Sequence, residues 1–351
     1  MLLGQPIADL EGYRPALTKK SDFEKFWSET LARYVQSEPV AELTRISSPI
    51  TEIDIFDVVV PGFNNDPIKG WFLTPRDLKE DRPALVIYEG YGGGRGNFNE
   101  WLFWANCGYP TLVMDTRGQG GGHRRGDTPD GLYPRGSSTA GFMTMGIESK
   151  EDYYYRRVYS DAVAFVRAAK TLPNVNSKRI ITTGGSQGGG IALAAASLAP
   201  EVYATMPDVP FLCHIHRAIE LTDAFPYQEI VNYCRIHRTD ADRALETLTY
   251  FDVMNLVTSA QAHALISLGM HDPICPPDTI FAMRNHYAGP VTTQVWEFNM
   301  HEGGASDQNL LQAKWLNQPG GLPERPMGGD CKSPGSAFEG SNPSPATSKN
   351  S

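Results

Sequence analysis

Residues 179–198 read RIITTGGSQGGGIALAAASL, and this stretch decides the fold. It joins an apolar, β-branched run to a helical run of small residues through the turn GGSQG at 184–188. A serine on a sharp strand-to-helix turn needs glycine neighbours, because a Cβ there would collide with the adjacent strand or helix. The pattern therefore predicts that Ser186 is a nucleophile. The alternative is a glycine-rich turn with an incidental serine.

Apolar runs like the one before this turn recur along the chain. They lie at residues 84–88, 110–114, 179–183, 203–206, 264–268 and 292–298. Each run is apolar on both faces and is followed by a helical stretch, which indicates an α/β fold with a mostly parallel central sheet flanked by helices. Two further strands are predicted at 53–60 and 71–74, joined by a turn rich in Gly, Asn and Asp.

The chain is predicted to divide into one α/β domain at residues 1–318 and a tail at 319–351. Residues 1–50 form a helical N-terminal extension in this interpretation, with a capping box at Ser21 and Glu24 that opens a helix. The tail holds six each of Pro, Gly and Ser among its 33 residues. It is predicted to be disordered, since it cannot bury enough apolar surface to offset its ordering entropy.

A helical insertion is predicted at about residues 209–258, between two late strands. Its helical patterns lie at 212–222, 227–237 and 241–248. An insertion at that point of the chain would cover the carboxyl ends of the strands as a lid.

The 351 residues carry a net charge of −9 with a pI near 5.4. Nucleic-acid binding needs a basic stripe that displaces counterions, so no nucleic-acid partner is expected. The N-terminus lacks the basic region of a secretion signal, and the most apolar window, 191–199, is far shorter than the roughly 20 residues of a membrane-spanning helix. The cysteines are odd in number and form no CxxC pair. Free thiols of this kind favour a cytoplasmic location.

A serine hydroxyl becomes a nucleophile when a base removes its proton, so a histidine and an orienting carboxylate should follow Ser186. In α/β-hydrolases the chain order is Ser, Asp or Glu, His. Asp272 follows the predicted strand at 264–268, and His301 follows the one at 292–298. Because open α/β sheets place their sites at the strand carboxyl ends, Asp272 is predicted as the acid and His301 as the base.

Four other residues compete for these two roles. Asp208 ends an earlier strand and stays open as an alternative acid. Asp278 falls at a helix start, where a carboxylate stabilises the helix dipole. His271 adjoins the predicted acid and His286 lies in an amphipathic helix, so both are weaker candidates for the base.

The oxyanion of a tetrahedral intermediate needs N–H donors. One is predicted to be the main-chain N–H of Gln187, and the second should come from the loop after an earlier strand. Residues 89–96, EGYGGGRG, occupy that place, and the Tyr91 N–H is the predicted donor. The glycines would let the backbone approach the substrate closely. The alternative is a flexible surface loop.

No metal or cofactor is expected. His214 and His216 look like a metal pair, but no third ligand follows at helical or loop spacing. The glycine-rich runs at 92–96 and 118–122 have neither the Walker lysine nor a dinucleotide fingerprint. The aromatic run at 153–157 opens an amphipathic helix and is expected to pack in the core.

The motifs RGQ at 117–119, GGSQG at 184–188 and HE at 301–302 together resemble carbohydrate esterase family 7. This family comprises acetyl xylan esterases and cephalosporin C deacetylases of the α/β-hydrolase superfamily. Further segments that resemble the family lie at 13–31, 114–120, 141–144, 153–157, 209–214 and 285–290. The resemblance covers about residues 5–316.

The resemblance implies roles for individual residues. It assigns the nucleophile, acid and base to Ser186, Asp272 and His301, and the oxyanion donors to the N–H groups of Tyr91 and Gln187. It also implies that Arg117 and Gln119 support the site, as a buried arginine with a paired carboxylate would. Many members have histidine where Glu89 stands, so the mouth of the site is expected to differ in charge.

The implied activity is that of a serine carboxylesterase acting on small acetyl esters, such as acetylated xylo-oligosaccharides and cephalosporin C, without a cofactor. The family further implies a cytoplasmic homo-oligomer, commonly a hexamer, with no membrane partner. Two alternatives are a serine peptidase of the prolyl-oligopeptidase type and a non-catalytic hydrolase fold that binds a small molecule. The residues before 84 are too few for the propeller of such peptidases, and an intact triad argues against a pure binding module.

Overall fold

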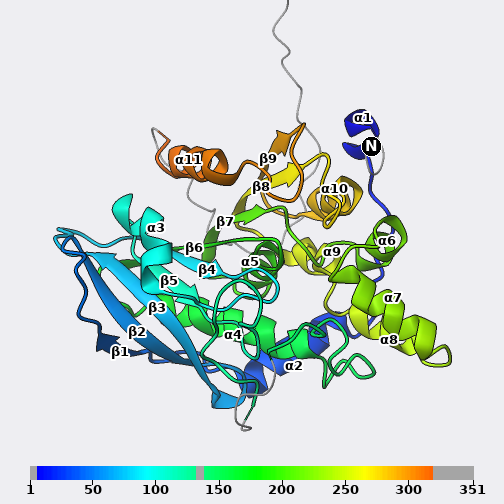
Figure 1. Ribbon diagram of the computed structural model, residues 1–351, viewed down its shortest axis with the longest axis horizontal. Helices are drawn as coiled ribbons and strands as arrows, with labels where there is room; N and C mark the ends of the chain where they lie inside the picture. The colour runs from blue at the N-terminus through cyan, green and yellow to red at the C-terminus, as the bar shows by residue number, and fades with distance from the viewer. Residues whose placement is uncertain (1–5, 132–137, 319–351) are drawn as a thin grey trace, which may run out of the picture.

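The computed structural model describes residues 6–131 and 138–318, so the tail predicted at 319–351 lies outside the described residues. Within the described ranges, nine strands form one sheet in the order β1-β2-β3-β5-β4-β6-β7-β8-β9 (Figure 1). The strands are β1 Glu42–Arg45, β2 Ile53–Pro61, β3 Pro67–Pro75, β4 Arg82–Tyr88, β5 Thr111–Met114, β6 Val175–Gly185, β7 Val202–Asp208, β8 His263–Gly269 and β9 Val291–Trp296.

The sheet is antiparallel at one end and parallel over the rest of its width. The pairs β1–β2, β2–β3 and β3–β5 are antiparallel. All pairs from β5–β4 through β8–β9 are parallel. The predicted α/β fold with a mostly parallel sheet is therefore confirmed. β1 has no counterpart among the predicted strands, because its short sequence ELTR lies at the sheet edge, largely exposed, without apolar alternation.

Helices cover both faces of the sheet. The described α-helices are α1 Ile7–Leu10, α2 Phe23–Tyr34, α3 Leu102–Asn106, α4 Tyr154–Ala169, α5 Gln187–Leu198, α6 Ile215–Leu221, α7 Tyr227–Ile236, α8 Ala241–Leu248, α9 Val253–Leu256, α10 Pro277–His286 and α11 Ala305–Leu316. α2, α4, α5, α9 and α10 contribute to the larger core, whereas α3 and α11 contribute to a smaller core. Side chains of a strand alternate between these cores, since Ile180 of β6 belongs to the larger and Ile181 to the smaller one.

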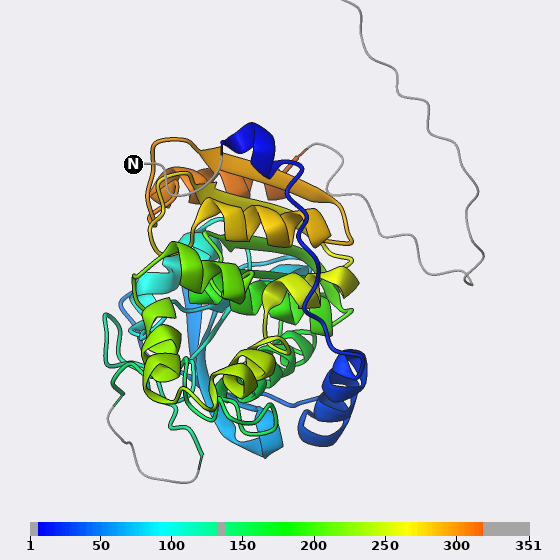
Figure 2. The ribbon, with the colours of Figure 1, turned by 90° about the vertical axis from the view of Figure 1, so that its right-hand side faces the viewer.

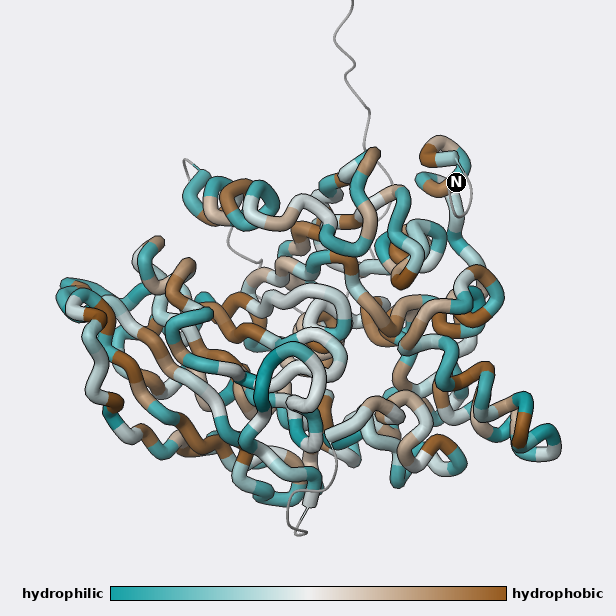
Figure 3. Tube along the Cα trace, in the orientation of Figure 1, coloured by the Kyte–Doolittle hydropathy of each residue, from teal (hydrophilic) through white to brown (hydrophobic). Residues whose placement is uncertain are grey.

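Hydropathy follows this layering. Figure 3 shows hydrophobic residues along the strands and hydrophilic residues in many of the connecting loops. Five consecutive residues of β4, Ala84–Tyr88, are buried, because a central strand covered on both faces has no solvent side. None of the helices in the described ranges is both long and apolar enough to cross a membrane.

The N-terminal extension crosses the helical side of the molecule, from α1 beside α10 to α2 beside α4 (Figure 2). Asn285 of α10 donates its Nδ2–H to Leu10 O at 3.0 Å and to Tyr13 O at 2.8 Å. Trp27 of α2 donates its Nε1–H to Tyr250 O at 2.9 Å. These bonds fasten the extension to the helices that flank the sheet.

The capping box predicted at Ser21 and Glu24 is wrong. α2 begins at Phe23 with Asp22 as its N-cap residue, and no side chain caps the helix. The Asp22 carboxylate instead accepts hydrogen bonds from Lys150 Nζ, at 2.5 Å, and from the Tyr250 hydroxyl. Donors from distant segments, which a local pattern does not contain, therefore hold this carboxylate in place of the helix amides.

The chain between β7 and β8 carries α6 to α9. The helices predicted at 227–237 and 241–248 are found as α7 and α8. α6 begins later than predicted, at Ile215, because Leu212 and His214 have φ values of 68° and 45°, which a right-handed helix does not admit. That this insertion acts as a lid stays a prediction.

Candidate active site

Ser186 joins β6 to α5 in a strained backbone conformation. Its φ of 55° and ψ of −119° lie outside the regions that ordinary L-residues adopt. The glycines make this turn possible, because a Cβ at Gly188 would lie 2.1 Å from Tyr88 O, and one at Gly184 would lie 2.5 Å from the same oxygen. The half-buried Ser186 side chain is thereby held at the carboxyl end of a central strand.

His301 and Asp272 form a hydrogen-bonded pair. His301 follows β9, and its Nδ1 lies 2.8 Å from Oδ2 of Asp272, which follows β8. The Asp272 side chain is fully buried, and its Oδ1 accepts the N–H groups of Ile274 at 2.8 Å and Cys275 at 2.9 Å. With the carboxylate at Nδ1, Nε2 is the ring nitrogen left to accept a proton from a substrate or nucleophile.

Ser186 and His301 line one cavity of about 300 Å³. Cys275 adjoins the same group, because its thiol, an Asp272 oxygen and a His301 ring nitrogen lie within 4.8 Å of one another. Burial raises the pKa of the Cys275 thiol, and a hydrogen bond with the Ser186 side chain opposes this rise in pKa. The fold thus brings the three predicted residues together from the ends of three strands. Cys275 joins them without a motif that would have singled it out.

Asp208, the alternative acid, lines the same cavity but makes other contacts. Its carboxylate accepts hydrogen bonds from Ser267 Oγ at 2.8 Å and from Gln312 Nε2 at 2.8 and 2.9 Å. Burial raises the pKa of Asp208 to about 6. Because it is the Asp272 carboxylate that hydrogen-bonds His301, whereas that of Asp208 binds Ser267 and Gln312, the geometry favours Asp272 as the partner of the base.

The remaining rivals lie elsewhere. Asp278 is buried in the first turn of α10, with Arg217 Nη2 at 3.9 Å. His286, at the other end of α10, has its Nε2 2.7 Å from Pro15 O in the N-terminal extension. His271 donates its main-chain N–H to Asn299 O, in the segment after β9, at 3.0 Å. None of these side chains is among the residues lining the cavity that holds the predicted nucleophile.

The loop after β4 lies against the start of α5. Gln187 Nε2 donates to Glu89 O at 3.2 Å, so the two segments are joined next to Ser186. Among the described residues, the main-chain N–H groups of Tyr91 and Gln187 have no hydrogen-bond partner. For Gln187 this follows from its place as the first residue of α5, where an N–H has no intrahelical acceptor. Both predicted oxyanion donors therefore keep their N–H groups available.

The Gln119 side chain hydrogen-bonds both of these segments. Its Oε1 accepts the Gly92 N–H at 2.7 Å, and its side-chain amide pairs with that of Gln187 at 2.9 Å. Two buried phenols complete the network, because Tyr154 OH accepts from Gln119 Nε2 and Tyr155 OH donates to Gln187 Oε1. These tyrosines pack in the core as expected. Their hydroxyls also support the site, which the need of a buried phenol for a partner could have indicated.

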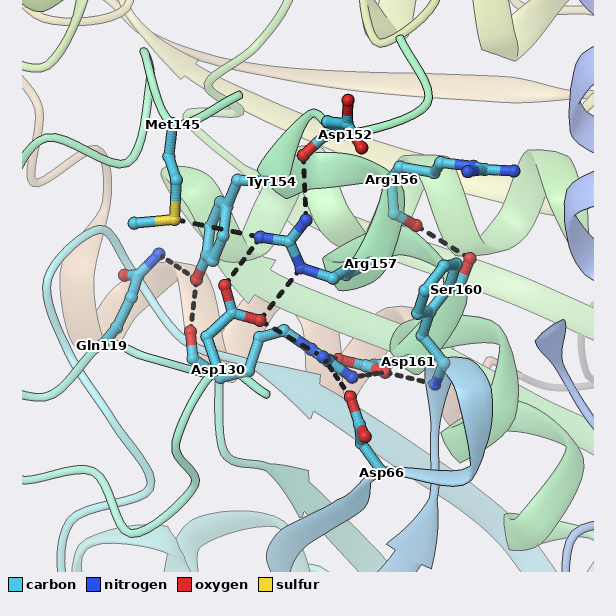
Figure 4. Close-up of polar contacts among 12 residues, drawn as sticks. Asp66, Gln119, Asp130, Met145, Asp152, Tyr154, Arg156, Arg157, Ser160 and Asp161 are labelled. Atoms are coloured by element: carbon cyan, nitrogen blue, oxygen red, sulfur yellow. Dashed lines mark hydrogen bonds and ion pairs between the residues drawn. The ribbon is translucent and has the colours of Figure 1, made fainter. Parts of the chain in front are cut away.

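Arg117 is fully buried and binds three carboxylates. Figure 4 labels these partners, Asp66, Asp130 and Asp161. Its Nε and Nη2 bind the two Asp161 oxygens at 2.6 and 2.8 Å, and Nη1 binds Asp66 at 2.8 Å and Asp130 at 3.3 Å. Its main-chain oxygen accepts the Tyr154 hydroxyl at 2.5 Å. The cluster fixes the loop that carries Gln119, so Arg117 acts on the site through that glutamine.

Replacing Arg117 with leucine is expected to lower the free energy of unfolding by about 3–5 kcal/mol, because Asp161 would remain buried without its partner. Arg45→Leu is the matched control, since Arg45 is 61% exposed and pairs with Asp54 at the surface. Such surface pairs contribute about 0–1 kcal/mol. Urea denaturation measures both losses of stability. Equal losses in the two variants would contradict the structural role of Arg117.

Glu89 is buried and paired. Its carboxylate lies 2.7 Å from Arg124 Nη1 and 3.1 Å from His123 Nε2, and it accepts the Gly90 N–H at 2.8 Å. The hydrogen bond to Glu89 is the main reason why the pKa of His123 is raised. The negative charge that distinguishes this position is therefore balanced by neighbouring basic side chains.

The suspected histidine pair does not assemble a metal site in the described part of the chain. His214 is buried, whereas His216 Nε2 lies 3.3 Å from Leu245 O. Within the same ranges, the group of potential ligands that lies close together is Asp272, Cys275 and His301, which contains the predicted acid and base.

The family model described as acetyl xylan esterase (AXE1) matches residues 1–318. A relative in the curated proteins is the acetyl esterase Axe7A of Xylanibacter ruminicola. It is 24% identical over 323 residues, which cover 88% of this chain and 70% of the relative.

Two similar solved structures are also acetyl xylan esterases. The acetyl xylan esterase from Paenibacillus sp. R4 is 37% identical, with a TM-score of 0.80, over 88% of this chain and 98% of that one. Acetyl xylan esterase 1 from Thermoanaerobacterium sp. JW/SL YS485 is 27% identical, with a TM-score of 0.79, over 88% and 97%. Dipeptidyl peptidase 4 of Porphyromonas gingivalis is 17% identical, with a TM-score of 0.53, over 83% and 36%. This last likeness shows the fold alone.

Proposed function

Because the chain belongs to the acetyl xylan esterase family, we propose that it removes acetyl groups from small carbohydrates with Ser186 as the nucleophile. Members of the family are carboxylic ester hydrolases with the α/β-hydrolase fold, and this chain is one of them. The observation that carries the proposal is the 2.8 Å hydrogen bond between the buried Asp272 and His301, since His301 lines the same cavity as Ser186 on its strained turn.

The first half-reaction acylates the serine. His301 Nε2 takes the proton from Ser186 Oγ as this oxygen attacks the acetyl carbonyl. Asp272 holds the proton on Nδ1 and stabilises the imidazolium that forms. The tetrahedral intermediate collapses as the bond to the sugar oxygen breaks, and His301 returns the proton to that oxygen. The sugar alcohol leaves, and an acetyl-enzyme remains.

The second half-reaction repeats the route with water. His301 removes a proton from a water molecule, which attacks the acetyl-enzyme, and the Ser186 oxygen leaves with that proton. The products are acetate and free enzyme. In both halves the N–H groups of Tyr91 and Gln187 donate to the oxyanion, where each such donor is typically worth about 10²–10³ in rate.

Aromatic side chains beside the nucleophile favour a short acyl group. The main-chain N–H of Phe211 donates to Ser186 O at 3.0 Å, and its ring is buried. The Tyr91 ring lies 6.4 Å from the Phe211 ring and 5.6 Å from the Phe142 ring. We propose that these rings bound the acyl site and leave room for a methyl group.

The test is the specificity constant kcat/KM for 4-nitrophenyl acetate, propionate and butyrate, alongside acetate release from acetylated xylobiose. We expect kcat/KM to fall by about tenfold or more with each added methylene, by the size of discrimination that one methylene gives. We also expect the wild type to release acetate from acetylated xylobiose. A higher kcat/KM for butyrate than for acetate, or hydrolysis of aminoacyl anilides in place of acetyl esters, would overturn the proposal.

Cephalosporin C is proposed as a second substrate, because it also carries an acetyl ester. Acetate release from it can be measured in the same assay. The homo-oligomer, the hexamer and the cytoplasmic location implied by the family stay predictions, and light scattering of the purified protein tests the oligomeric state.

A further inference from the structure

The loop that carries the proposed oxyanion donor is bound to the helical insertion through its tyrosine side chain. Tyr91 OH donates to the Glu229 carboxylate, with its oxygen 2.7 and 2.9 Å from the two carboxylate oxygens. Glu229 lies in the first turn of α7. The bond therefore joins the loop after β4 to a helix that enters the chain far later, between β7 and β8.

A third segment completes this contact. The Phe142 N–H donates to Tyr91 OH at 2.9 Å, the Gly141 N–H approaches the same oxygen at 3.3 Å, and the Met143 N–H donates to a Glu229 oxygen at 3.1 Å. The Met143 oxygen in turn accepts the hydroxyl of the buried Tyr153 at 3.0 Å. Tyr91 and Glu229 thus bind the same stretch of backbone, residues 141–143, which the buried Tyr153 also contacts.

The surroundings make this bond strong. Burial raises the pKa of the Glu229 carboxyl, whereas the hydrogen bond from Tyr91 lowers it. Burial also raises the pKa of Tyr91, so its hydroxyl keeps the proton that it donates. A hydrogen bond to a carboxylate is stronger where little water screens it.

The position of Glu229 in α7 does not explain these contacts. A carboxylate in the first turn of a helix commonly stabilises the helix dipole. Here, however, the Glu229 carboxylate accepts hydrogen bonds from the Tyr91 hydroxyl and the Met143 N–H, which belong to other segments. The Glu229 carboxylate therefore binds the oxyanion loop and the Met143 backbone, and not the N–H groups of its own helix.

Between Glu89 and Arg95, Tyr91 is the one residue of that loop that is not glycine. Residues 92–94 are glycines, and Gly92 has a φ of 79°. The Gln119 Oε1 accepts the N–H of Gly92, the residue that follows Tyr91. The peptide group that carries the Tyr91 N–H is held at its carbonyl end, where Gly90 O accepts the Gly93 N–H at 3.1 Å. The phenol anchor adds the contact that holds the Tyr91 side chain, and without it the Tyr91 N–H would lose part of the direction that an oxyanion requires.

We propose that Glu229 is a positioning residue for ester hydrolysis, which holds the Tyr91 hydroxyl so that the Tyr91 N–H points at the developing oxyanion. The inference rests on the proposed esterase function. Glu229 does not contact the reacting atoms. It acts through Tyr91, and it makes the oxyanion donor depend on where the helical insertion sits.

The test compares Tyr91→Phe, Glu229→Ala, Glu229→Gln and the Tyr91→Phe/Glu229→Ala double variant on 4-nitrophenyl acetate. We expect kcat to fall on the order of 10- to 100-fold in the first two, as misplaced catalytic groups do. KM should change little, because the lost interaction exists in the transition state. Glu229→Gln should recover part of the rate, since its amide oxygen can still accept the Tyr91 hydroxyl.

The matched control is Glu220→Gln, the same chemical change on α6 of the same insertion. Its carboxylate is 65% exposed and pairs with Arg217, away from the oxyanion loop. We expect wild-type kcat in this control. The double variant should lose no more than Tyr91→Phe alone, because both changes remove one shared bond.

Wild-type kcat in both Tyr91→Phe and Glu229→Ala, a change confined to KM, or additive losses in the double variant would overturn the inference. Thermal melting of each variant identifies any that fails to fold. Tyr91→Phe, which loses a single hydroxyl, then decides alone. A wild type without esterase activity would contradict the proposed function itself, whereas an active wild type with unaffected variants would contradict this inference only.

Discussion

Ser186→Ala is expected to lower kcat for acetyl ester hydrolysis by about 10⁶-fold, as loss of the nucleophile does in serine hydrolases. The reason is chemical, because no other group in the described cavity replaces the hydroxyl that forms the acetyl-enzyme. The backbone of the turn should stay as it is, since alanine keeps the Cβ that already occupies the strained conformation. The measurement is kcat on 4-nitrophenyl acetate together with the melting temperature.

Ser197→Ala is the matched control for this change. Ser197 lies on the helix that Ser186 opens, and its hydroxyl donates to Leu193 O at 2.7 Å, within the helix. We expect near wild-type kcat and an unchanged melting temperature in the control. Retained activity in a correctly folded Ser186→Ala variant would show that another group is the nucleophile.

Asp272→Asn is expected to lower kcat by about 10⁴-fold through the wrong histidine tautomer. The Asp272 Oδ1 position accepts N–H groups from Ile274 and Cys275, so the asparagine oxygen should take that place. The asparagine NH₂ group then faces His301 Nδ1, which must accept in place of donating. The ring proton moves to Nε2, and this nitrogen can no longer take the proton from Ser186.

Asp208→Asn provides the comparison, because Asp208 is the rival acid in the same cavity. Its carboxylate binds Ser267 and Gln312, so we expect it to keep most of the wild-type kcat. The kcat values of both variants, measured across pH on protein of verified fold, separate the two assignments. A large loss in Asp208→Asn with little loss in Asp272→Asn would identify Asp208 as the acid.

Local signals in the sequence were enough to predict the sharp turn at Ser186 and the mostly parallel sheet. Ser186 and its glycines lie within five consecutive residues, and the strain that they accommodate is a property of that turn. Asp272 and His301 could be chosen because each follows an apolar strand. Their 2.8 Å contact then follows from the parallel order of β8 and β9 in the sheet.

Contacts between distant segments could not be predicted in this way. The Asp22 carboxylate does not cap its helix, because it binds Lys150 and Tyr250, which come close to it only in the folded chain. The bond between Tyr91 and Glu229 spans 138 positions of sequence and has no motif of its own. A predicted supporting role for Gln119 came from family resemblance, whereas its amide pair with Gln187 is seen only in three dimensions.

The most direct test of the central claim is the site of covalent labelling by a fluorophosphonate, mapped by peptide mass spectrometry. Such a probe reacts with a serine that an adjacent base has activated. With Ser186 as the nucleophile, we expect one phosphonyl group on the peptide that contains Ser186, and loss of esterase activity in proportion to labelling. Full esterase activity after complete labelling of Ser186, or complete inactivation with the label on a different residue, would contradict the assignment of Ser186 as the nucleophile.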